Sequence, residues 1–596
     1  MWIKDNKIFN YALVLFLLFL FSNNICYNLI SIIENKFVLK WSFNFFNSIS
    51  SVLNYRFLFG NALLLIIMFL IIAKYDRTIR LKFARKKGLP QGDGNFEHGS
   101  SRWLTKKEIK KNFKVWEINK PLISGGVPVT SIGGKVYYDD STDHSLVIGS
   151  TGSGKTRSFI MPLIFNLADA GESMVINDTK GELYSTTYDY LKNKGYEIRV
   201  INLRDAFASD GWNPLHLPYK YYKEGNIDEA GDLIENFAKS LTKNLSSKDM
   251  YWEKSATSVL SALCYAIIED APRESQVNLY SIYNLLVEHG AKDINRRNSL
   301  DLYFQEKPFG NLAKNSYATG SFAKGETRAT LFSVLATVIK MFSDTGIANL
   351  TSHTDFELSD IGKKKTAVFL IIPDEKQSRH ELACLFIDQC YMALINSAQL
   401  MSNGMMPVRV NFILDEFANM PPISNISNKI TVSRSRNIRF YLVLQDFDQL
   451  KEKYKEASGT IKSNCTNWVY LLTSDNETAK EISARLGKYT ISSDRVSTSS
   501  RLEQIDFNIS NDKSLMGREL LMPDELMRFG FGESIFIKTR MHPIKAVILP
   551  IEAYDFNIKY SDVPKLSKER TIDIFDLDKY RERVKQERIE LLADIV

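Results

Sequence analysis

The residues at positions 149–156 have the types and spacing of a loop that binds nucleotide phosphates. They match the pattern G-x-x-x-x-G-K-[ST], whose glycines let backbone N–H groups turn inward around phosphate oxygens. In this pattern the lysine, here Lys155, reaches the β- and γ-phosphates, and the hydroxyl of Thr156 coordinates Mg²⁺. The segment therefore predicts binding of ATP with Mg²⁺. Its residues are Gly149, Ser150, Thr151, Gly152, Ser153, Gly154, Lys155 and Thr156.

Two adjacent carboxylates follow an apolar run much later in the chain. Residues 408–416 read VRVNFILDE, a pattern typical of a buried strand that ends in Asp415 and Glu416. We expect Asp415 to hold Mg²⁺ through water and Glu416 to act as the general base that polarises the attacking water. The structural alternative is a strand that ends in two solvated carboxylates.

A third apolar run, residues 438–444, ends at Gln445, whose amide at a strand tip could sense the γ-phosphate. The alternative for Gln445 is a side chain that only caps a helix.

Residues 433–439 read SRSRNIR, and an arginine there could stabilise transition-state charge in the site of a neighbouring subunit. The alternative for these arginines is a solvated basic loop.

The elements that position these residues alternate between strands and helices, which predicts a mostly parallel α/β sheet. The run HSLVIG at 144–149 predicts a buried strand before the phosphate loop, and residues 157–170 predict a helix after it that ends at Gly171. The other predicted strands are 174–177, 197–203, 367–372, 410–414, 439–444, 468–472, 534–538 and 546–549.

The 260 residues between Lys155 and Asp415 exceed what a minimal nucleotide-binding core needs. Residues 221–349 are poor in strand patterns and rich in helical ones, so we expect an inserted all-α domain there. The predicted division is an anchor of two transmembrane helices with a short external loop (1–75), a basic juxtamembrane segment and connector (76–143), the nucleotide-binding domain in two parts (144–220 and 350–553), the insertion (221–349), and a charged C-terminal tail (554–596). Within the tail, residues 571–596 are expected to end in a solvated helix.

Two apolar stretches, about 9–33 and 57–73, are each near the ~20 residues that cross a bilayer. Between Lys74 and Lys87 lie seven basic residues and one acidic one, +6 of the net charge of +7. The positive-inside rule therefore places the N-terminus and everything after Lys74 in the cytoplasm, with the protein in the cell membrane.

Because the rest of the chain is close to neutral, bulk charge does not indicate a nucleic-acid partner. Five cysteines without a CxxC pair disfavour a disulfide framework or a zinc site.

Further short motifs occur along the chain in a fixed order. They read HGSSRW at 98–103, NDTKGEL at 177–183, WNP at 212–214, LDEFAN at 414–419, LGKYT at 486–490 and RELL at 518–521. Together with the phosphate loop, Gln445 and the predicted anchor, this set resembles the TraG-like type IV secretion coupling proteins, which are conjugative transfer ATPases. Ser101 stands where that family usually has Ala, and Thr179 where it usually has Pro.

The resemblance implies a RecA-like P-loop NTPase fold with an inserted all-α domain and an N-terminal two-helix transmembrane anchor, assembled as a homo-hexamer. It implies partners: a relaxase–DNA complex, carrying single-stranded DNA, with accessory proteins, and the components of a type IV secretion channel in the membrane. ATP hydrolysis would drive the transfer. By spacing from Glu416 and Gln445, the family's trans-acting arginine corresponds to Arg434, with Arg436 as the alternate.

Two other functions compete with this interpretation. An FtsK-like double-strand DNA translocase usually has more membrane helices, a long linker and a C-terminal winged helix, and the roughly 45 residues after the last predicted strand are too few for such a module. A membrane-bound recruitment scaffold for protein export would bind nucleotide but turn it over little. An ABC-type exporter is disfavoured because no LSGGQ-like signature follows the phosphate loop.

Overall fold

The computed structural model describes residues 96–593, apart from 119, 244–249, 295–296, 324, 374, 500–507, 555 and 557–567, together with a few positions between 24 and 32. The predicted transmembrane anchor and basic juxtamembrane segment lie outside the described residues. Among the described helices, none is by itself long and apolar enough to cross a bilayer, and one bent pair, Glu326–Ser343 with Thr345–Thr351, meets that test by length and composition. The chain divides into one compact unit of residues 1–95 and 491–514 and a second of 96–490 and 515–596. The nine-stranded sheet and the insertion belong to the second unit.

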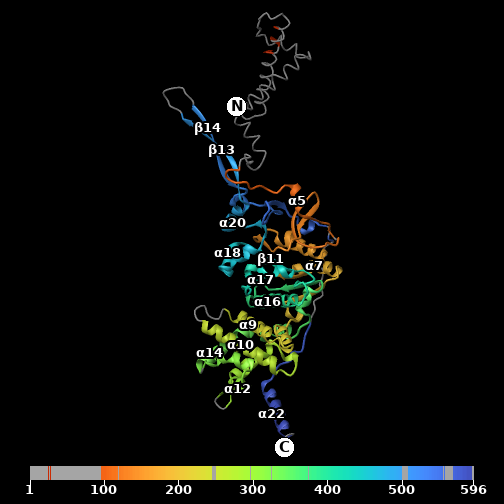
Figure 1. The fold of residues 1–596 in the computed structure, drawn as a ribbon, viewed down its shortest axis with the longest axis vertical. Helices are drawn as coiled ribbons and strands as arrows, with labels where there is room; N and C mark the ends of the chain where they lie inside the picture. Colours follow the sequence, from red (N-terminus) through yellow and green to blue (C-terminus); the bar gives the residue numbers. More distant parts are fainter. Residues whose placement is uncertain are drawn as a thin grey trace, which may run out of the picture. The chain divides into compact units, whose positions relative to one another are not determined.

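A mostly parallel sheet of nine strands forms the centre of this unit among the described residues (Figure 1). Every strand predicted from the sequence belongs to it, and only its two last strands along the chain run antiparallel to their neighbours. In order across the sheet, the strands are β16 (Ile544–Val547), β15 (Glu533–Lys538), β12 (Asn467–Leu472), β4 (Ser145–Gly149), β11 (Ile438–Leu444), β10 (Val410–Leu414), β5 (Ser173–Asp178), β9 (Thr366–Ile371) and β6 (Glu197–Asn202).

The central strands are buried on both faces, which explains why they read as continuous apolar runs rather than alternating ones. Val147 of β4 packs against the helices on one face of the sheet, whereas Leu146 and Ile148 pack against the helices on the other face. The first layer contains α6 (Met161–Asp169) and α7 (Glu182–Asn193). The second contains α16 (Gln377–Gln399), α17 (Ile426–Ser433) and α18 (Phe447–Tyr454).

Strand β16 begins two residues before the predicted segment 546–549 and ends earlier. Its pairing with β15 ends at Val547, and the next amide, of Ile548, donates instead to the carbonyl of Gly532, at 2.9 Å. The apolar run thus continues past the end of the strand.

The prediction of a connector over 76–143 is wrong for residues 114–139. These form an antiparallel sheet of β1 (Lys114–Trp116), β2 (Val127–Ile132) and β3 (Lys135–Asp139). Gly133 and Gly134 both have positive φ, +59° and +75°, as tight hairpin turns require. The small sheet belongs to the same apolar core as α6, and the Trp116 Nε1–H donates to Asp169 at 2.9 Å.

The insertion is helical as predicted, apart from a two-strand pair, and begins slightly before residue 221. Figure 1 shows α9, α10, α12 and α14 gathered together away from the sheet. Its elements are α8 (His216–Lys223), α9 (Ile227–Thr242), α10 (Met250–Asp270), α11 (Leu279–Gly290), β7 (Asp293–Ile294), β8 (Arg297–Asn298), α12 (Ser299–Glu306), α13 (Leu312–Ser321), α14 (Glu326–Ile339) and α15 (Thr345–Thr351).

The first described part of the tail after residue 567 packs on the rest of the unit, so the prediction of a solvated segment over 571–596 is wrong for residues 571–576. Lys568 pairs with Asp210 at 2.8 Å on the sheet domain, and the Phe575 amide donates to the hydroxyl of Ser281 at 3.0 Å in the insertion. Asp573 also accepts from the insertion, including the guanidinium of Arg273 at 2.9 Å. The segment therefore ties the insertion to the sheet domain before α22 (Leu577–Ala593), the helix that the tail was expected to form.

Three motifs that are distant in the sequence meet at the base of a β-hairpin. The Ser101 hydroxyl donates to the carbonyl of Leu486 at 2.5 Å, and its amide donates to Lys488 at 2.9 Å. A Cβ on Gly99 would lie 2.3 Å from the Lys488 carbonyl oxygen, so only glycine fits there. Leu520 donates to Gly487 at 3.1 Å. The hairpin strands are β13 (Lys488–Ser499) and β14 (Asn508–Glu519).

A buried arginine joins the amino ends of the central strands. Arg439 of β11 donates to Asn411 of β10 at 2.9 Å and forms an ion pair with Glu172, which precedes β5. It also donates to the carbonyls of Gly125 and Ser141. Removing one partner of such a buried pair costs about 3–5 kcal/mol, because the other charge stays buried without compensation.

The remaining described helices are α5 (Lys106–Asn112), α19 (Ala457–Asn464), α20 (Asn476–Leu486) and α21 (Pro523–Leu526), with short 3₁₀ turns at Ala206–Ala208, Glu274–Gln276, Lys340–Ser343, Leu358–Gly362 and Ile551–Ala553.

Candidate nucleotide site

The phosphate loop connects the carboxyl end of β4 to a helix, as its sequence predicted. Gly152 and Gly154 have φ of +80° and +85°, the left-handed region that favours glycine. A Cβ on Gly149 would lie 2.6 Å from the Ser153 hydroxyl oxygen and 2.7 Å from Cγ of Lys155. Gly152 and Gly154 are thus required by the backbone conformation, and Gly149 by the lack of space for a side chain. Together they allow the loop to turn tightly at the end of β4.

The helix after the loop begins with a π-helical turn, Lys155–Ile160, before the regular α6. Pro162 has no N–H to donate, and the amide of Met161 bonds to the carbonyl of Thr156, five residues back. Such turns occur often at functional sites. Here the turn carries both Lys155 and Thr156, the residues predicted to contact phosphate and metal.

Lys155 folds back over its own loop. Its amino group donates to the carbonyl oxygens of Gly149 and of Ser150, the latter at 3.3 Å. Burial lowers the pKa of Lys155, and the negative charges of Asp415 and Glu416 oppose that shift. The two carboxylates therefore lie within electrostatic reach of the lysine, as the sequence required of a nucleotide site.

Sheet register brings these groups to one edge. Ile148 of β4 pairs with Leu444 of β11, and Leu442 of β11 pairs with Leu414 of β10. The carboxyl ends of the three adjacent strands therefore present the phosphate loop, Gln445 and Asp415 side by side. Ligands of parallel α/β sheets bind at this edge.

Asp415 is half-buried at the tip of β10. Burial raises its pKa to about 6, with the charge of Glu416 adding to the shift and that of Lys155 opposing it. A carboxylate that is costly to ionise without a partner is suited to receive a cation.

Glu416 has a left-handed backbone, with φ of +50° and ψ of +39°. This conformation costs roughly 1–3 kcal/mol for a residue with a side chain, and such strain clusters at functional sites. The Glu416 amide donates to Asp415 Oδ1 at 2.9 Å, and the Asn419 side-chain amide donates to Glu416 Oε2 at 3.0 Å. The turn η6 (Phe417–Asn419) thus holds the carboxylate in place.

Gln445 does not serve as a helix cap. Asp446 is the N-cap of α18 and accepts from the amide of Gln449 at 2.8 Å. Gln445 is half-buried and follows the end of β11, the strand that lies between β4 and β10. The structure therefore excludes the capping alternative, and the sensor role of Gln445 stays a prediction.

Two residues at the end of β5 also belong to this edge, and the sequence interpretation gave them no role. The Asn177 side-chain amide donates to the carbonyl of Asp415 at 2.6 Å. Asp178 accepts from the amides of Gly181 and Tyr184, at 2.9 and 2.8 Å, and so supports the start of α7. An acid directly after an apolar run was the available signal, the same one that identified Asp415.

The predicted trans-acting arginines lie elsewhere. Arg434 and Arg436 form the turn η7 (Arg434–Arg436) before β11. The turn lies at the opposite edge of the sheet from the phosphate loop, separated from it by the length of β11, roughly 20 Å. Arg434 pairs with Asp143 at 3.1 Å, and Arg436 donates to the carbonyl of Gly404 at 3.1 Å. The structure thus does not bring either arginine to the phosphate loop of its own subunit.

The loop has free hydrogen-bonding capacity for phosphate. Among the described residues, the buried hydroxyl of Ser153 and the amide oxygen of Asn177 have no hydrogen-bond partner. Other described residues also carry such atoms, but these two lie at the loop and at the adjacent strand end, where a ligand, ion or water could bond to them. The residues present therefore fit a nucleotide phosphate with Mg²⁺.

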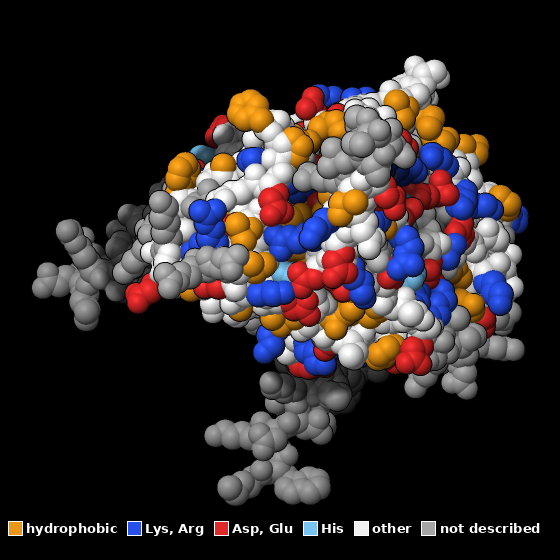
Figure 2. Space-filling model, turned by 90° about the horizontal axis from the view of Figure 1, so that it is seen from below, with side chains coloured by type: hydrophobic (Ala, Val, Ile, Leu, Met, Phe, Trp, Pro, Cys, Tyr) orange, Lys and Arg blue, Asp and Glu red, His pale blue; other side chains and the backbone are white. Residues whose placement is uncertain are grey.

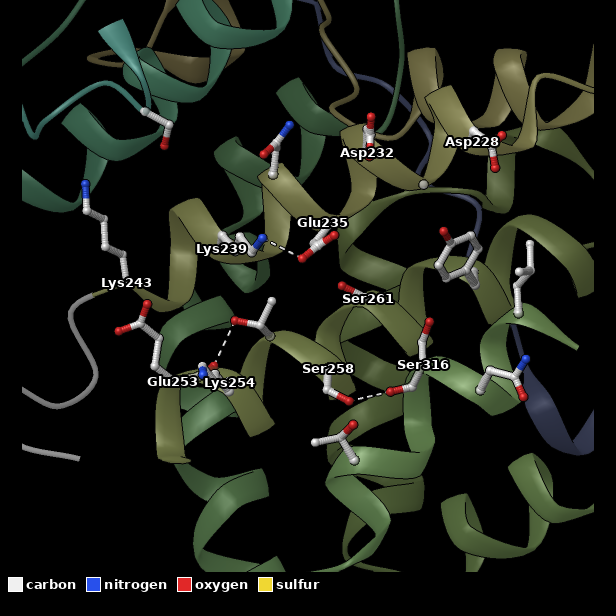
Figure 3. Close-up of a pocket in the computed structure, with 18 of the residues that line it drawn as sticks. Asp228, Asp232, Glu235, Lys239, Lys243, Glu253, Lys254, Ser258, Ser261 and Ser316 are labelled. Atoms are coloured by element: carbon white, nitrogen blue, oxygen red, sulfur yellow. Dashed lines mark hydrogen bonds and ion pairs between the residues drawn. The ribbon is translucent and has the colours of Figure 1, made fainter. Parts of the chain in front are cut away.

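A separate hollow of about 1170 Å³ lies in the insertion (Figure 3). Helices α9, α10 and α13 line it, together with Ser424 and Asn425 of the sheet domain. Its walls are mainly charged and hydroxyl side chains. Asp228, Asp232 and Glu235 follow one another along α9, and Glu235 pairs with Lys239 at 2.5 Å.

Comparison with known proteins identifies the group to which this architecture belongs. The family model "Type IV secretory system Conjugative DNA transfer" matches residues 99–548. The conjugal transfer protein TraG of Escherichia coli is 26% identical over 476 residues, which cover 73% of this chain and 71% of that protein. The protein VirD4 of Rhizobium rhizogenes is 23% identical over 456 residues, which cover 75% of this chain and 64% of that protein.

Solved structures of the conjugative coupling protein TrwB share the fold. The unbound form has a TM-score of 0.55 at 16% identity, covering 81% of this chain and 99% of that one. The complex of TrwB with ADP and Mg²⁺ has a TM-score of 0.55 at 15% identity, covering 81% of this chain and all of that one. Because the family model spans most of the sequence, this chain belongs to the type IV secretory system conjugative DNA transfer family, as a coupling protein of the TraG type.

Proposed function

We propose that the chain is a membrane-anchored ATPase that recruits a relaxase bound to single-stranded DNA and drives it to a type IV secretion channel. The observation that carries this proposal is the set of Lys155, Asp415 and Glu416 at neighbouring strand ends, in a chain of the conjugative DNA transfer family. The TrwB complexes with an ATP analogue and with ADP and Mg²⁺ support the same ligands here.

The proposed division of labour follows from the positions of the side chains. The loop amides would hold the α- and β-phosphates and Lys155 would reach the β- and γ-phosphates. Thr156 and Asp415 would hold Mg²⁺, which would offset phosphate charge. Glu416, fixed by Asn419, takes a proton from the attacking water. Gln445, at the end of the strand between β4 and β10, would contact the γ-phosphate and report its loss.

The site is incomplete without a neighbouring subunit in this proposal. The Arg434 side chain is 57% exposed at the edge of the sheet opposite the phosphate loop, where it is open to another copy. A homo-hexameric ring would place it beside the next subunit's phosphates. Its ion pair with Asp143 is an exposed one and contributes little stability, so release costs little.

The membrane anchor is part of the proposal. The apolar stretches at 9–33 and 57–73, followed by the basic segment 74–87, support a cell-membrane location with the ATPase domain in the cytoplasm. Tethering of this kind would keep the motor at the entrance of a secretion channel.

The hollow in the insertion is the proposed docking place for a protein partner rather than for DNA. Figure 2 shows basic and acidic side chains intermixed over the face seen from the side of the insertion, whereas phosphate backbones are bound by concentrated positive charge. Within the hollow, Asp228 and Asp232 give one end of α9 a negative charge. The next acid along the helix, Glu235, adds little to it, because its charge is offset by Lys239. A basic segment of the relaxase or of an accessory protein fits such a surface.

Lys155→Ala is expected to abolish nucleotide binding, and Glu416→Gln is expected to retain binding but slow hydrolysis by roughly 10²–10⁴-fold, because only the general base is lost. Equilibrium ATP binding, ATPase rate and conjugative transfer measure these effects. The exposed pair Lys120 and Glu117 supplies matched controls, Lys120→Ala and Glu117→Gln, which should change nothing. Normal transfer by both site variants would support the recruitment scaffold instead, and transfer of double-stranded DNA without a relaxase would support an FtsK-like translocase.

Asp415 should make both metal binding and stability depend on pH. Mg²⁺ needs the ionised carboxylate, so Mg²⁺-dependent nucleotide affinity should fall as pH drops through about 6. In metal-free protein the native pKa exceeds the unfolded value of about 3.9, so the stabilising contribution of protonated Asp415 is complete below pH 4 and is lost as pH rises through 6.

The isosteric variant Asp415→Asn should therefore raise the metal-free free energy of unfolding by roughly 1–2 kcal/mol at pH 8, and much less at pH 4. Denaturant unfolding of the full chain at the two pH values, and Mg²⁺ titration at pH 5–8, measure these differences. If the free energy of unfolding changed with pH in the same way in the variant and the wild type, the raised pKa of Asp415 would be wrong.

Arg434→Ala should leave ATP binding intact and reduce the assembly-stimulated ATPase rate on the order of 10³-fold, because transition-state charge loses its partner. The ATPase rate per subunit, measured against protein concentration with and without single-stranded DNA, tests this. Arg436→Ala is the matched variant, and a larger loss there would transfer the role to Arg436. A rate independent of concentration and unaffected by either change would argue against a shared site.

Reversing charge at the hollow with Asp228→Lys and Asp232→Lys should lower relaxase binding and transfer at least tenfold while nucleotide affinity stays unchanged. Pull-down of a purified relaxase and mating frequency are the measurements. Glu288→Lys, at an exposed position on α11 outside the hollow, is the control. Unimpaired transfer by the double variant would place the docking surface elsewhere.

A further inference from the structure

Phe531 is an exposed aromatic residue in the loop between α21 and β15, with 63% of its surface accessible. Single apolar residues on a surface need no explanation by themselves. The position of Phe531 does, because the loop brings its ring to the phosphate-binding segment, almost 380 residues earlier in the chain.

The ring lies against the last glycine of the phosphate loop. A Cβ built on Gly154 would be 2.7 Å from Cε2 and 3.4 Å from Cζ of Phe531. Any other residue at 154 would therefore strike the ring, in addition to straining the backbone at φ of +85°. The aromatic ring and the loop backbone form one continuous surface directly before Lys155.

The loop that presents the ring is held on both sides. The Gly530 amide donates to the Glu533 carboxylate at 2.9 Å, and the Ile548 amide donates to the carbonyl of Gly532 at 2.9 Å. On the other flank, Phe529 packs edge-on against Tyr470 with ring centroids 5.8 Å apart. Because its neighbours are fixed, Phe531 points outward from a positioned loop rather than from a free one.

The geometry points to a role for Phe531 as the stacking surface for the base of the bound nucleotide, an inference that rests on the nucleotide site proposed above. The loop amides hold the α- and β-phosphates, so the ribose and base must lie beyond the loop at its rim. An aromatic ring at that rim offers a π-face to a purine. Stacking of this kind tolerates any base, because it reads no hydrogen-bonding edge.

A stacking contact gives little selectivity between bases. If stacking supplies the main contact with the base, adenine and guanine nucleotides should bind with similar affinity. Base stacking on an aromatic side chain is worth on the order of tenfold or more in affinity.

The test compares ligands with and without a base on the full chain. Phe531→Ala should weaken binding of Mg-ATP and Mg-GTP about tenfold and leave the affinity for inorganic tripolyphosphate unchanged, whereas Phe531→Tyr should bind all three as the wild type does. Phe309→Ala removes a fully exposed ring in the insertion and is the matched control, with no expected effect. Isothermal titration calorimetry gives each affinity.

A second variant reports the contact directly. Phe531→Trp should show a change in tryptophan emission with Mg-ATP that tripolyphosphate does not produce. Unchanged ATP affinity in Phe531→Ala would overturn the stacking role, and an equal loss of tripolyphosphate affinity would show that the ring only supports the loop. Failure of the wild-type chain to bind either ligand would instead refute the nucleotide site itself.

Discussion

The register between β4, β11 and β10 is the constraint on which the function of this protein depends. Ile148 pairs with Leu444, and Leu442 with Leu414, so three strands end together. A shift of one residue in either pairing would turn the following side chain to the other face of the sheet. Only the observed register brings Lys155 within the field of Asp415 and Glu416.

The opposite edge of the same strands is fastened by buried charge. Arg439 connects β11 to Asn411 of β10 and to Glu172 before β5, and its guanidinium also holds the carbonyls of Gly125 and Ser141. Hydrophobic packing is not directional, whereas these bonds require particular strand positions. Arg439 thereby fixes strand ends at one edge, and the proposed phosphate site lies at the other.

Most of the sheet could be predicted because parallel strands that are buried on both faces leave continuous apolar runs. Residues 114–139 were missed because their short strands lie in a segment read as glycine-rich and basic, although Gly133-Gly134 marked a hairpin turn. The segment 568–576 was missed because polar bonds, such as that of Lys568 to Asp210, leave no periodic pattern in a sequence.

The sequence by itself determined the phosphate loop, the acids at 415 and 416, Gln445 and the helical insertion, because each depends on residue types within a few positions of one another. Only the tertiary structure decided which distant segments meet. It placed Ser101 on Leu486, Phe531 on Gly154, and Arg434 away from its own phosphate loop. Such contacts arise from strand order and loop path, and chain positions hundreds of residues apart carry no local signal of them.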